Sequence, residues 1–290
     1  MTTHSGAPVV VGIDGSARAL EATRLAAAEA ALHHRPLRIV HVMQWPRLFG
    51  DGRSDPPDSL KSQAHVWLHD AALHAAEEAP GIPLVKETLV GPPAAKLIGA
   101  TASAFLLVIG DRGMGGFTGL STGSMAVQVA MHGAAPVLVV RGTPAVDGPV
   151  VVGVDGSASA ARALTFAAQE ASLRGTELVA LHAWTMPALV GPPAMMPLAY
   201  DPPAIALEEQ RVLAEALAGI GEKHPDLTVR RELPPGPPAR ALIDAARHAQ
   251  LVVVGSRGRG GFAGMLLGSV SQHLLHHATC PVVVVESGRS

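Results

Sequence analysis

The sequence predicts an α/β protein with two similar domains, each a five-stranded doubly wound parallel sheet with helices on both faces. Three observations lead to this prediction. Short apolar runs alternate with helix-compatible segments, the same order of segments occurs twice, and the runs are apolar at consecutive positions, as in strands buried on both faces. A length of 290 residues suits two domains. We place them at 1–142 and 149–290.

The first domain is expected to alternate strand and helix from its start. Ser16 is a good N-cap for the first helix, and the proline residues after Gly91 suit the first turn of the third. A Pro-rich stretch, 46–57, lies between the second strand and the second helix. The predicted strands are 9–13, 37–42, 84–90, 105–109 and 136–140, and the predicted helices are 16–33, 58–79, one from 92, and 124–132.

The second domain repeats this order, with a second variable stretch at 187–203. The linker between the domains, about 142–149, is too short to let them separate, so we expect them to pack together. The predicted strands are 150–154, 177–183, 227–233, 251–254 and a terminal strand after Pro281, and the predicted helices are 157–173, 204–223, one from 237, and one after Ser269.

Composition excludes several function classes. The net charge is −2 and the pI about 6.7, so no basic face for nucleic acid or a membrane surface is indicated. One cysteine, Cys280, rules out an intramolecular disulfide and fits a reducing compartment. No apolar run reaches the roughly 20 residues of a membrane helix, and the first residues do not resemble a signal peptide. We therefore expect a cytoplasmic protein.

A glycine pattern occurs once in each domain, between a predicted strand and a predicted helix. Every position of the second copy lies 145 residues after its counterpart in the first. Such a loop lets backbone N–H groups approach an anion and ends at a positively polarised helix N-terminus, where a serine can cap the helix and donate to phosphate. The residues are Gly110, Gly113, Gly123 and Ser124 in the first copy and Gly255, Gly258, Gly268 and Ser269 in the second.

The pattern differs from the two best-known phosphate-binding loops. No Gly-Lys-Ser/Thr follows, so it is not a Walker P-loop. It follows the fourth strand of the domain, so it is not the Rossmann fingerprint either. The alternative interpretation is a glycine-rich connection that only turns the chain.

Asp14 and Asp155 each follow the first strand of their domain, within Gly-Ile-Asp-Gly-Ser and Gly-Val-Asp-Gly-Ser. A carboxylate at the carboxyl end of a strand can accept a ribose hydroxyl or reach a phosphate-bound Mg²⁺. The alternative is an Asx turn that starts the first helix.

These motifs together resemble the tandem universal stress protein family over nearly the whole chain. The resemblance rests on Val-Gly-Ile-Asp-Gly-Ser, a strand ending in His41-Val42, Gly-x2-Gly-x9-Gly-Ser and a terminal Pro-Val-Leu-Val-Val strand, all recurring in the second half. It implies ATP as ligand, with Mg²⁺, in one site per domain. By the same resemblance Asp14 and Asp155 approach the ribose, the backbone at Val42 and Ala183 receives adenine, and the glycine loops hold the phosphates. It further implies that the domains pair through their last strands and that chains dimerise.

The two loops differ in one charged position. The first has Asp111 where the second has Ser256. A carboxylate there would repel a triphosphate unless it is turned away or paired with Mg²⁺. Arg112 and Arg257 follow, and each either offsets charge or faces solvent.

Other polar residues are interpreted structurally. His273, His276, His277 and Cys280 have metal-like spacing, but the first domain does not share them, which disfavours a metal site. His41 and His182 occupy matching positions and are better explained as satisfied core histidines than as ligand contacts. The pairs Glu77-Glu78 and Glu208-Glu209 are most simply solvated helix charges.

The sequence thus predicts a regulatory, ATP-binding stress-response protein. Its expected partners are an adenine nucleotide, a second copy of the chain and an unidentified regulatory protein. Cyclic AMP or another adenine nucleotide remains an alternative ligand. A slow ATPase or an adenylyl- or phosphoryl-transfer enzyme is one alternative function, although no Ser-His-Asp order or Lys-bearing loop supports dedicated catalysis. A scaffold with vestigial sites is the other.

Overall fold

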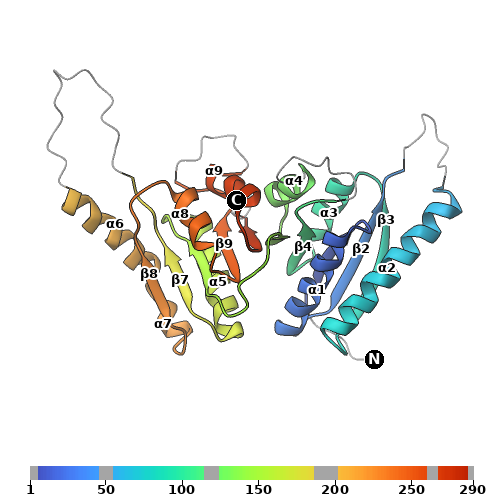
Figure 1. Cartoon of the computed structure of the whole chain (residues 1–290), viewed down its shortest axis with the longest axis horizontal. Helices are drawn as coiled ribbons and strands as arrows, with labels where there is room; N and C mark the ends of the chain where they lie inside the picture. Colours follow the sequence, from blue (N-terminus) through green and yellow to red (C-terminus); the bar gives the residue numbers. More distant parts are fainter. Residues whose placement is uncertain (1–5, 46–54, 114–123, 186–201, 260–266, 287–290) are drawn as a thin grey trace, which may run out of the picture.

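The chain forms one sheet from both halves. The computed structural model describes residues 6–45, 55–113, 124–185, 202–259 and 267–286. Within them, ten strands pair in the order β3-β2-β1-β4-β5-β10-β9-β6-β7-β8. Figure 1 shows the halves side by side, with helices on both faces of the sheet. Among the described residues, every helix is too short or too polar to cross a membrane.

The elements follow the predicted order closely. In the first half they are β1 (Val9–Ile13), α1 (Ala17–Leu32), β2 (Leu37–Met43), α2 (Asp58–Glu78), β3 (Leu84–Val90), α3 (Pro93–Thr101), β4 (Leu106–Gly110), α4 (Ser124–His132) and β5 (Val137–Val140). In the second half they are β6 (Val150–Gly153), α5 (Ala158–Arg174), β7 (Leu178–Leu181), α6 (Pro202–Ala216), α7 (Ile220–Lys223), β8 (Val229–Glu232), α8 (Pro238–Ala245), β9 (Leu251–Gly255), α9 (Ser269–His277) and β10 (Val282–Val285).

The predicted doubly wound parallel fold is confirmed. In the first half β1 pairs in parallel with both β2 and β4, so the chain order reverses at β1. In the second half β6 pairs in the same way with β7 and β9. Each half therefore has a switch point where loops from the carboxyl ends of neighbouring strands meet, the usual place for a ligand in such sheets.

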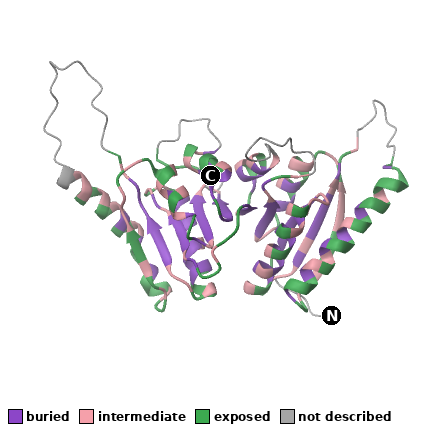
Figure 2. Ribbon diagram, in the orientation of Figure 1, coloured by how far each residue is buried: buried purple, intermediate pink, exposed green. Residues whose placement is uncertain are grey.

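Two apolar layers cover the sheet. Val9 and Val11 point to the layer under α1, α2, α5 and α6, whereas Val10 between them points to the layer under α3, α4, α8 and α9. This alternation explains why the strands are apolar at consecutive positions. Figure 2 shows the buried residues concentrated in the central strands. Alanines on the inner side of α1, such as Ala22 and Ala26, let the helix approach the sheet closely.

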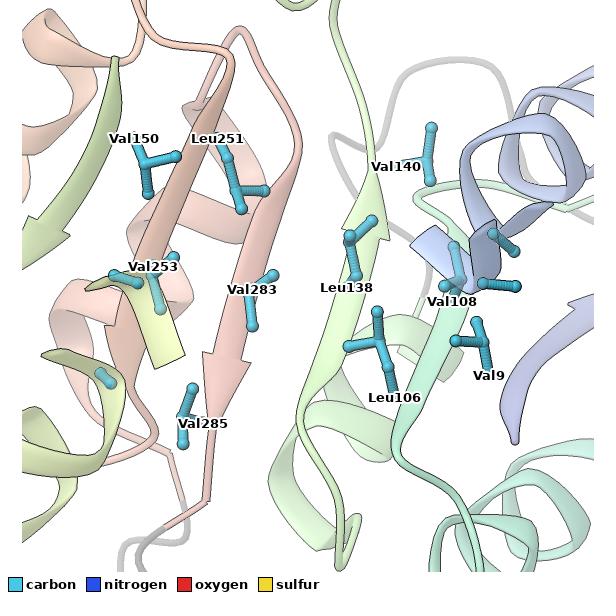
Figure 3. Packing of buried hydrophobic residues seen from close by; sticks show 14 of the residues in the cluster. Val9, Leu106, Val108, Leu138, Val140, Val150, Leu251, Val253, Val283 and Val285 are labelled. Atoms are coloured by element: carbon cyan, nitrogen blue, oxygen red, sulfur yellow. The ribbon is translucent and has the colours of Figure 1, made fainter. Parts of the chain in front are cut away.

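The halves meet through β5 and β10, which pair antiparallel. Leu138 lies opposite Val283 in this register. Both are buried, and Figure 3 shows them on facing strands in a row of apolar side chains that runs from one half to the other. The expected pairing of the domains through their last strands is therefore confirmed, and these two strands have no open edge left.

Two further contacts join the halves around this seam. Arg141, just after β5, is buried and donates from Nη1 to the carbonyl oxygen of Leu274 at 2.8 Å and from Nη2 to that of His276 at 2.9 Å, with a further bond to Leu275. A guanidinium at the C-terminus of α9 satisfies otherwise unpaired carbonyls and complements the helix dipole. Burial lowers the pKa of Arg141, and the Asp111 carboxylate opposes this shift.

On the other side of the seam, α1 and α5 bring together Glu29, His33, Glu170 and Arg174. We call these four residues the interdomain cluster. The side chains of Glu29, His33 and Glu170 are each at most 2% exposed. Arg174 is bonded to both carboxylates. Burial, and then the neighbouring Glu170 charge, raise the pKa of Glu29 to about 7.

One predicted element is different in the structure. The helix expected over 204–223 is divided into α6 and α7, because Gly219 between them has φ 78°, a left-handed conformation that ends a helix. The predicted 58–79 helix contains no such residue and is the continuous α2.

The linker generates a first prediction. Gly142 has φ 56°, and a Cβ there would overlap the backbone carbonyl of Thr279, which also accepts the Thr143 N–H. We expect Gly142→Ala to lower the stability of the chain by roughly 2–4 kcal/mol, since strain and a backbone clash add. The matched control is Gly175→Ala. Gly175 has φ 63° and open space around it, so only the conformational cost of about 1 kcal/mol applies. If urea unfolding showed the same loss of stability in Gly142→Ala and Gly175→Ala, the steric argument would be wrong.

The interdomain cluster generates a second prediction. The folded-state pKa of Glu29 lies near 7, above its ordinary value, so the folded chain retains a proton that the unfolded chain releases. This contribution to stability is complete below about pH 4.5 and is lost as pH rises through 7. Glu29→Gln imitates the protonated form and removes the dependence. In metal-free buffer we expect wild type to lose stability relative to Glu29→Gln between pH 5 and pH 8, on the order of 3 kcal/mol.

The control for this prediction is Glu78→Gln, at an exposed position on α2. It should follow wild type at every pH in thermal unfolding. A constant difference between wild type and Glu29→Gln across the range would show that Glu29 does not titrate there.

Candidate functional site

The second half contains a cavity at the carboxyl ends of its central strands. Its volume is about 590 Å³. It lies at the switch point beside β6, where ends of β6, β7 and β9 converge with the start of α9. The structure brings all six residues predicted for this half onto its wall: Asp155, Ala183, Gly255, Gly258, Gly268 and Ser269.

Asp155 holds two segments of this cavity together. Its Oδ1 accepts the Ser157 N–H at 2.9 Å, which is the Asx turn considered from sequence. Its Oδ2 accepts the backbone N–H of Arg259 at 3.0 Å, in the glycine loop. A Cβ at Gly258 would lie 2.5 Å from the same oxygen, so glycine is required for this approach. Each carboxylate oxygen retains a second lone pair.

The N-terminus of α9 borders the cavity. Gly268, with φ −72° and ψ 153°, is the N-cap and Ser269 is the first helical residue, so this serine does not take the capping position expected of its counterpart Ser124. As a glycine, the cap residue itself offers no side-chain oxygen to the first N–H groups of this helix. Gly268 is held in place by donating its N–H to the backbone carbonyl oxygen of Ser256 at 2.7 Å. The polarised start of α9 thus borders the cavity at a glycine cap, which suits an anion.

His182 and Glu209 form a polar pair on the opposite wall. Nδ1 of His182 donates to the carbonyl oxygen of Val154 at 2.6 Å, and Nε2 lies 2.6 Å from a Glu209 carboxylate oxygen. His182 is buried, as the core interpretation predicted. The interpretation of Glu209 as a solvated helix charge is wrong, since it contacts this histidine and lines the cavity. The sequence could have indicated this contact, because Glu209 shares a helix face with Leu213, which is buried.

The first half builds its switch point differently. His41 again donates to the end of the first strand, at 2.9 Å from the Ile13 carbonyl oxygen, but its ring meets the edge of Trp67 with centroids 5.1 Å apart. Trp67 also lies against Gly15. Ala64 occupies the position that corresponds to Glu209, by the 145-residue spacing. The two switch points therefore share the same strand arrangement, but the side chains around them differ.

The residues predicted for the first site lie as follows. Asp14 accepts the Ser16 N–H at 3.0 Å, and its other oxygen lies beside Gly113. Gly110 ends β4, Val42 lies on β2, and Ser124 begins α4. Gly123 lies outside the described residues, as do most of both variable stretches.

Asp111 contacts α1. It is buried, and its Oδ1 lies 3.1 Å from Nε of Arg18 on α1. The repulsion expected from a carboxylate at this position is thereby offset within the protein. Arg112 and Arg257, the next residues in the two loops, are both exposed, and Arg257 lines the second cavity.

Comparison with known proteins agrees with the tandem arrangement. The sequence model of the universal stress protein family matches residues 7–141 and again 148–286. The chain belongs to the universal stress protein family. A universal stress protein of Mycolicibacterium smegmatis is 39% identical over 296 residues, covering 96% of each chain. One from Mycobacterium tuberculosis is 38% identical over 298 residues, covering 97% of each. A solved universal stress protein of Archaeoglobus fulgidus, 21% identical, has the same fold with a TM-score of 0.72 over 98% of this chain and all of its own.

Several residues of this universal stress protein cavity were not foreseen. Arg259 follows Gly258 in the loop, and its guanidinium lies against Gly156. Ser159, at the start of α5, donates its hydroxyl to the carbonyl oxygen of Arg257. Ser271 donates to the carbonyl oxygen of Gly255 at 2.7 Å. These two hydrogen bonds and the Arg259 contact hold the described part of the loop in place, and no motif in the sequence marks them.

The histidines and cysteine at the end of α9 are not brought together as a metal site. Cys280 is buried, and burial raises the pKa of its thiol to about 12. Nδ1 of His273 donates to the Ser269 carbonyl oxygen at 2.8 Å. The structural interpretation of these residues fits both observations.

Proposed function

We propose that this universal stress protein binds ATP with Mg²⁺, one nucleotide in each domain, and that occupancy regulates its contact with a partner protein. The observation that carries the proposal is the second cavity. It places a carboxylate, a close-approach glycine loop and a helix N-terminus with a glycine cap around one space. Its volume of about 590 Å³ lies within the range of small-molecule pockets, about 300–1,000 Å³.

The chemistry of the wall suggests how the nucleotide lies. Ala183 offers backbone groups at one end for adenine. The remaining lone pairs of Asp155 suit a ribose hydroxyl or a water on Mg²⁺. The phosphates belong at the start of α9 and along the loop, where Arg257 and Arg259 add positive charge. Mg²⁺ would be carried mainly by the phosphates, because the described cavity wall offers few carboxylates.

The role we propose is regulatory because the described wall of the cavity contains no lysine and His182 is engaged on both nitrogens. Slow ATP turnover or group transfer is the alternative. Nucleotide can shift the conformation of the chain only by its difference in affinity for two states. The affinity of the chain for its partner protein should therefore be measured both with and without bound nucleotide.

Chain dimerisation stays a prediction, and it would need a surface other than β5 or β10.

A third prediction tests the two sites separately. We expect about two adenine nucleotides per chain in nucleotide-saturated wild type, measured by mass analysis of denatured protein. Gly258→Ala should remove the second site, since its Cβ would press on Asp155, and Gly113→Ala should remove the first through Asp14. Each should weaken its site at least tenfold, which corresponds to about 1.4 kcal/mol. Gly221→Ala on α7, with open space around it, is the control.

The outcomes separate the alternatives. Wild type that carries no nucleotide and gains no thermal stability with ATP and Mg²⁺ would refute the proposal and favour a scaffold. Phosphate release above a blank, lost when Asp14→Ala and Asp155→Ala are combined, would favour the enzyme. Unchanged stoichiometry in Gly258→Ala would place the nucleotide elsewhere.

A further inference from the structure

The interdomain cluster lies far from the glycine loops, at the contact between α1 and α5, and the proposed function does not use it. Its members occupy equivalent places in the two halves. Glu170 and Arg174 each lie 141 residues after Glu29 and His33. Two equivalent carboxylates therefore face each other across the seam, with a histidine on one side and an arginine on the other.

The carboxylates divide their oxygens between two neighbours. Arg174 donates to Oε1 of Glu29 and, at 3.0 Å, to Oε2 of Glu170. The other two oxygens face His33, whose Nε2 lies 2.6 Å from Oε1 of Glu170 and 3.7 Å from Oε2 of Glu29. One oxygen or nitrogen from each of the three residues lies within 4.8 Å of the others.

One atom in this arrangement lacks a hydrogen-bond partner among the described residues. Oε2 of Glu29 is buried and accepts no hydrogen bond from any residue in the described part of the chain. A buried carboxylate oxygen without a partner carries a substantial desolvation cost. It also faces the second carboxylate at close range, so a cation between them would relieve both penalties.

We propose that Glu29, His33 and Glu170 bind a divalent transition-metal ion of the zinc type between the two domains. Nitrogen and oxygen ligands in this ratio suit zinc, whereas Mg²⁺ and Ca²⁺ favour oxygen alone. Zinc bonds of 2.0–2.2 Å place tetrahedral ligand atoms about 3.4 Å apart. The two distances from His33 Nε2, 2.6 Å and 3.7 Å, lie on either side of that value, so small side-chain rotations are enough to form the site. The ion takes the place of the proton between His33 and Glu170.

The surroundings favour this role. Arg174 occupies the outer oxygens and orients both carboxylates, as outer-shell partners of metal ligands do. When both carboxylates are ionised, they and Arg174 sum to one negative charge, which attracts a divalent ion. Phe105 contacts the His33 ring, with centroids 4.6 Å apart, and Phe166 lies 6.4 Å beyond it from the other half. These rings exclude water and hold the imidazole.

The test is zinc binding by the full chain, measured in competition with a chromophoric chelator. Because the ligands are buried, the chain is refolded with and without zinc after chelator treatment. We expect one zinc per chain and a higher thermal unfolding midpoint. His33→Gln and Glu29→Gln should each weaken binding at least tenfold. The matched control is His34→Asn, at the adjacent exposed histidine, where φ is 51° and asparagine is tolerated.

A second comparison separates this site from the α9 histidines, whose rings lie 6.1–6.2 Å apart. Zinc binding lost in His277→Asn but kept in His33→Gln would overturn the proposal. So would equal binding by His33→Gln and His34→Asn, or no zinc retained by wild type. X-ray absorption of zinc-loaded wild type needs no variant. One imidazole with oxygen ligands supports the proposal, and two or more imidazoles or a thiolate overturn it.

Discussion

The antiparallel pairing of β5 with β10 is the constraint on which the rest of this molecule depends. It joins two doubly wound sheets into one, so that each apolar layer continues from one half to the other. Each strand covers the edge that the other would leave open, and an open apolar edge is a site of aggregation. The pairing also fixes where α1 meets α5 and where Arg141 meets α9. The two halves are therefore one packing unit, although each has the complete topology of a domain.

Pairing two similar halves in this way brings equivalent residues face to face. Where those residues are charged, like charges meet. At the contact of α1 and α5 this happens to Glu29 and Glu170. A strict repeat would give the same cation on both sides, but this chain has His33 on one side and Arg174 on the other. The arginine can span both carboxylates from outside, and the histidine can approach from within. That difference between the halves creates a three-ligand cluster that neither half contains alone.

The predictable part of this structure is what each half encodes locally. Apolar runs such as 105–109 and caps such as Ser16 gave the elements, and the family resemblance gave the pairing of the last strands. The break at Gly219 was missed because a single glycine in a helical pattern is usually tolerated. Glu209 was misjudged because only tertiary contact with His182 distinguishes it from a solvated charge. Contacts across 141 residues, as between Glu29 and Glu170, leave no local signal at all.

The two candidate nucleotide sites are joined by one physical element, α9. Its start borders the second cavity, and its last carbonyls bind Arg141 of the first half. Arg141 in turn interacts with Asp111, which pairs with Arg18 beside the first glycine loop. The buried charges behind the first switch point are thus held by the end of the same helix whose start borders the second cavity.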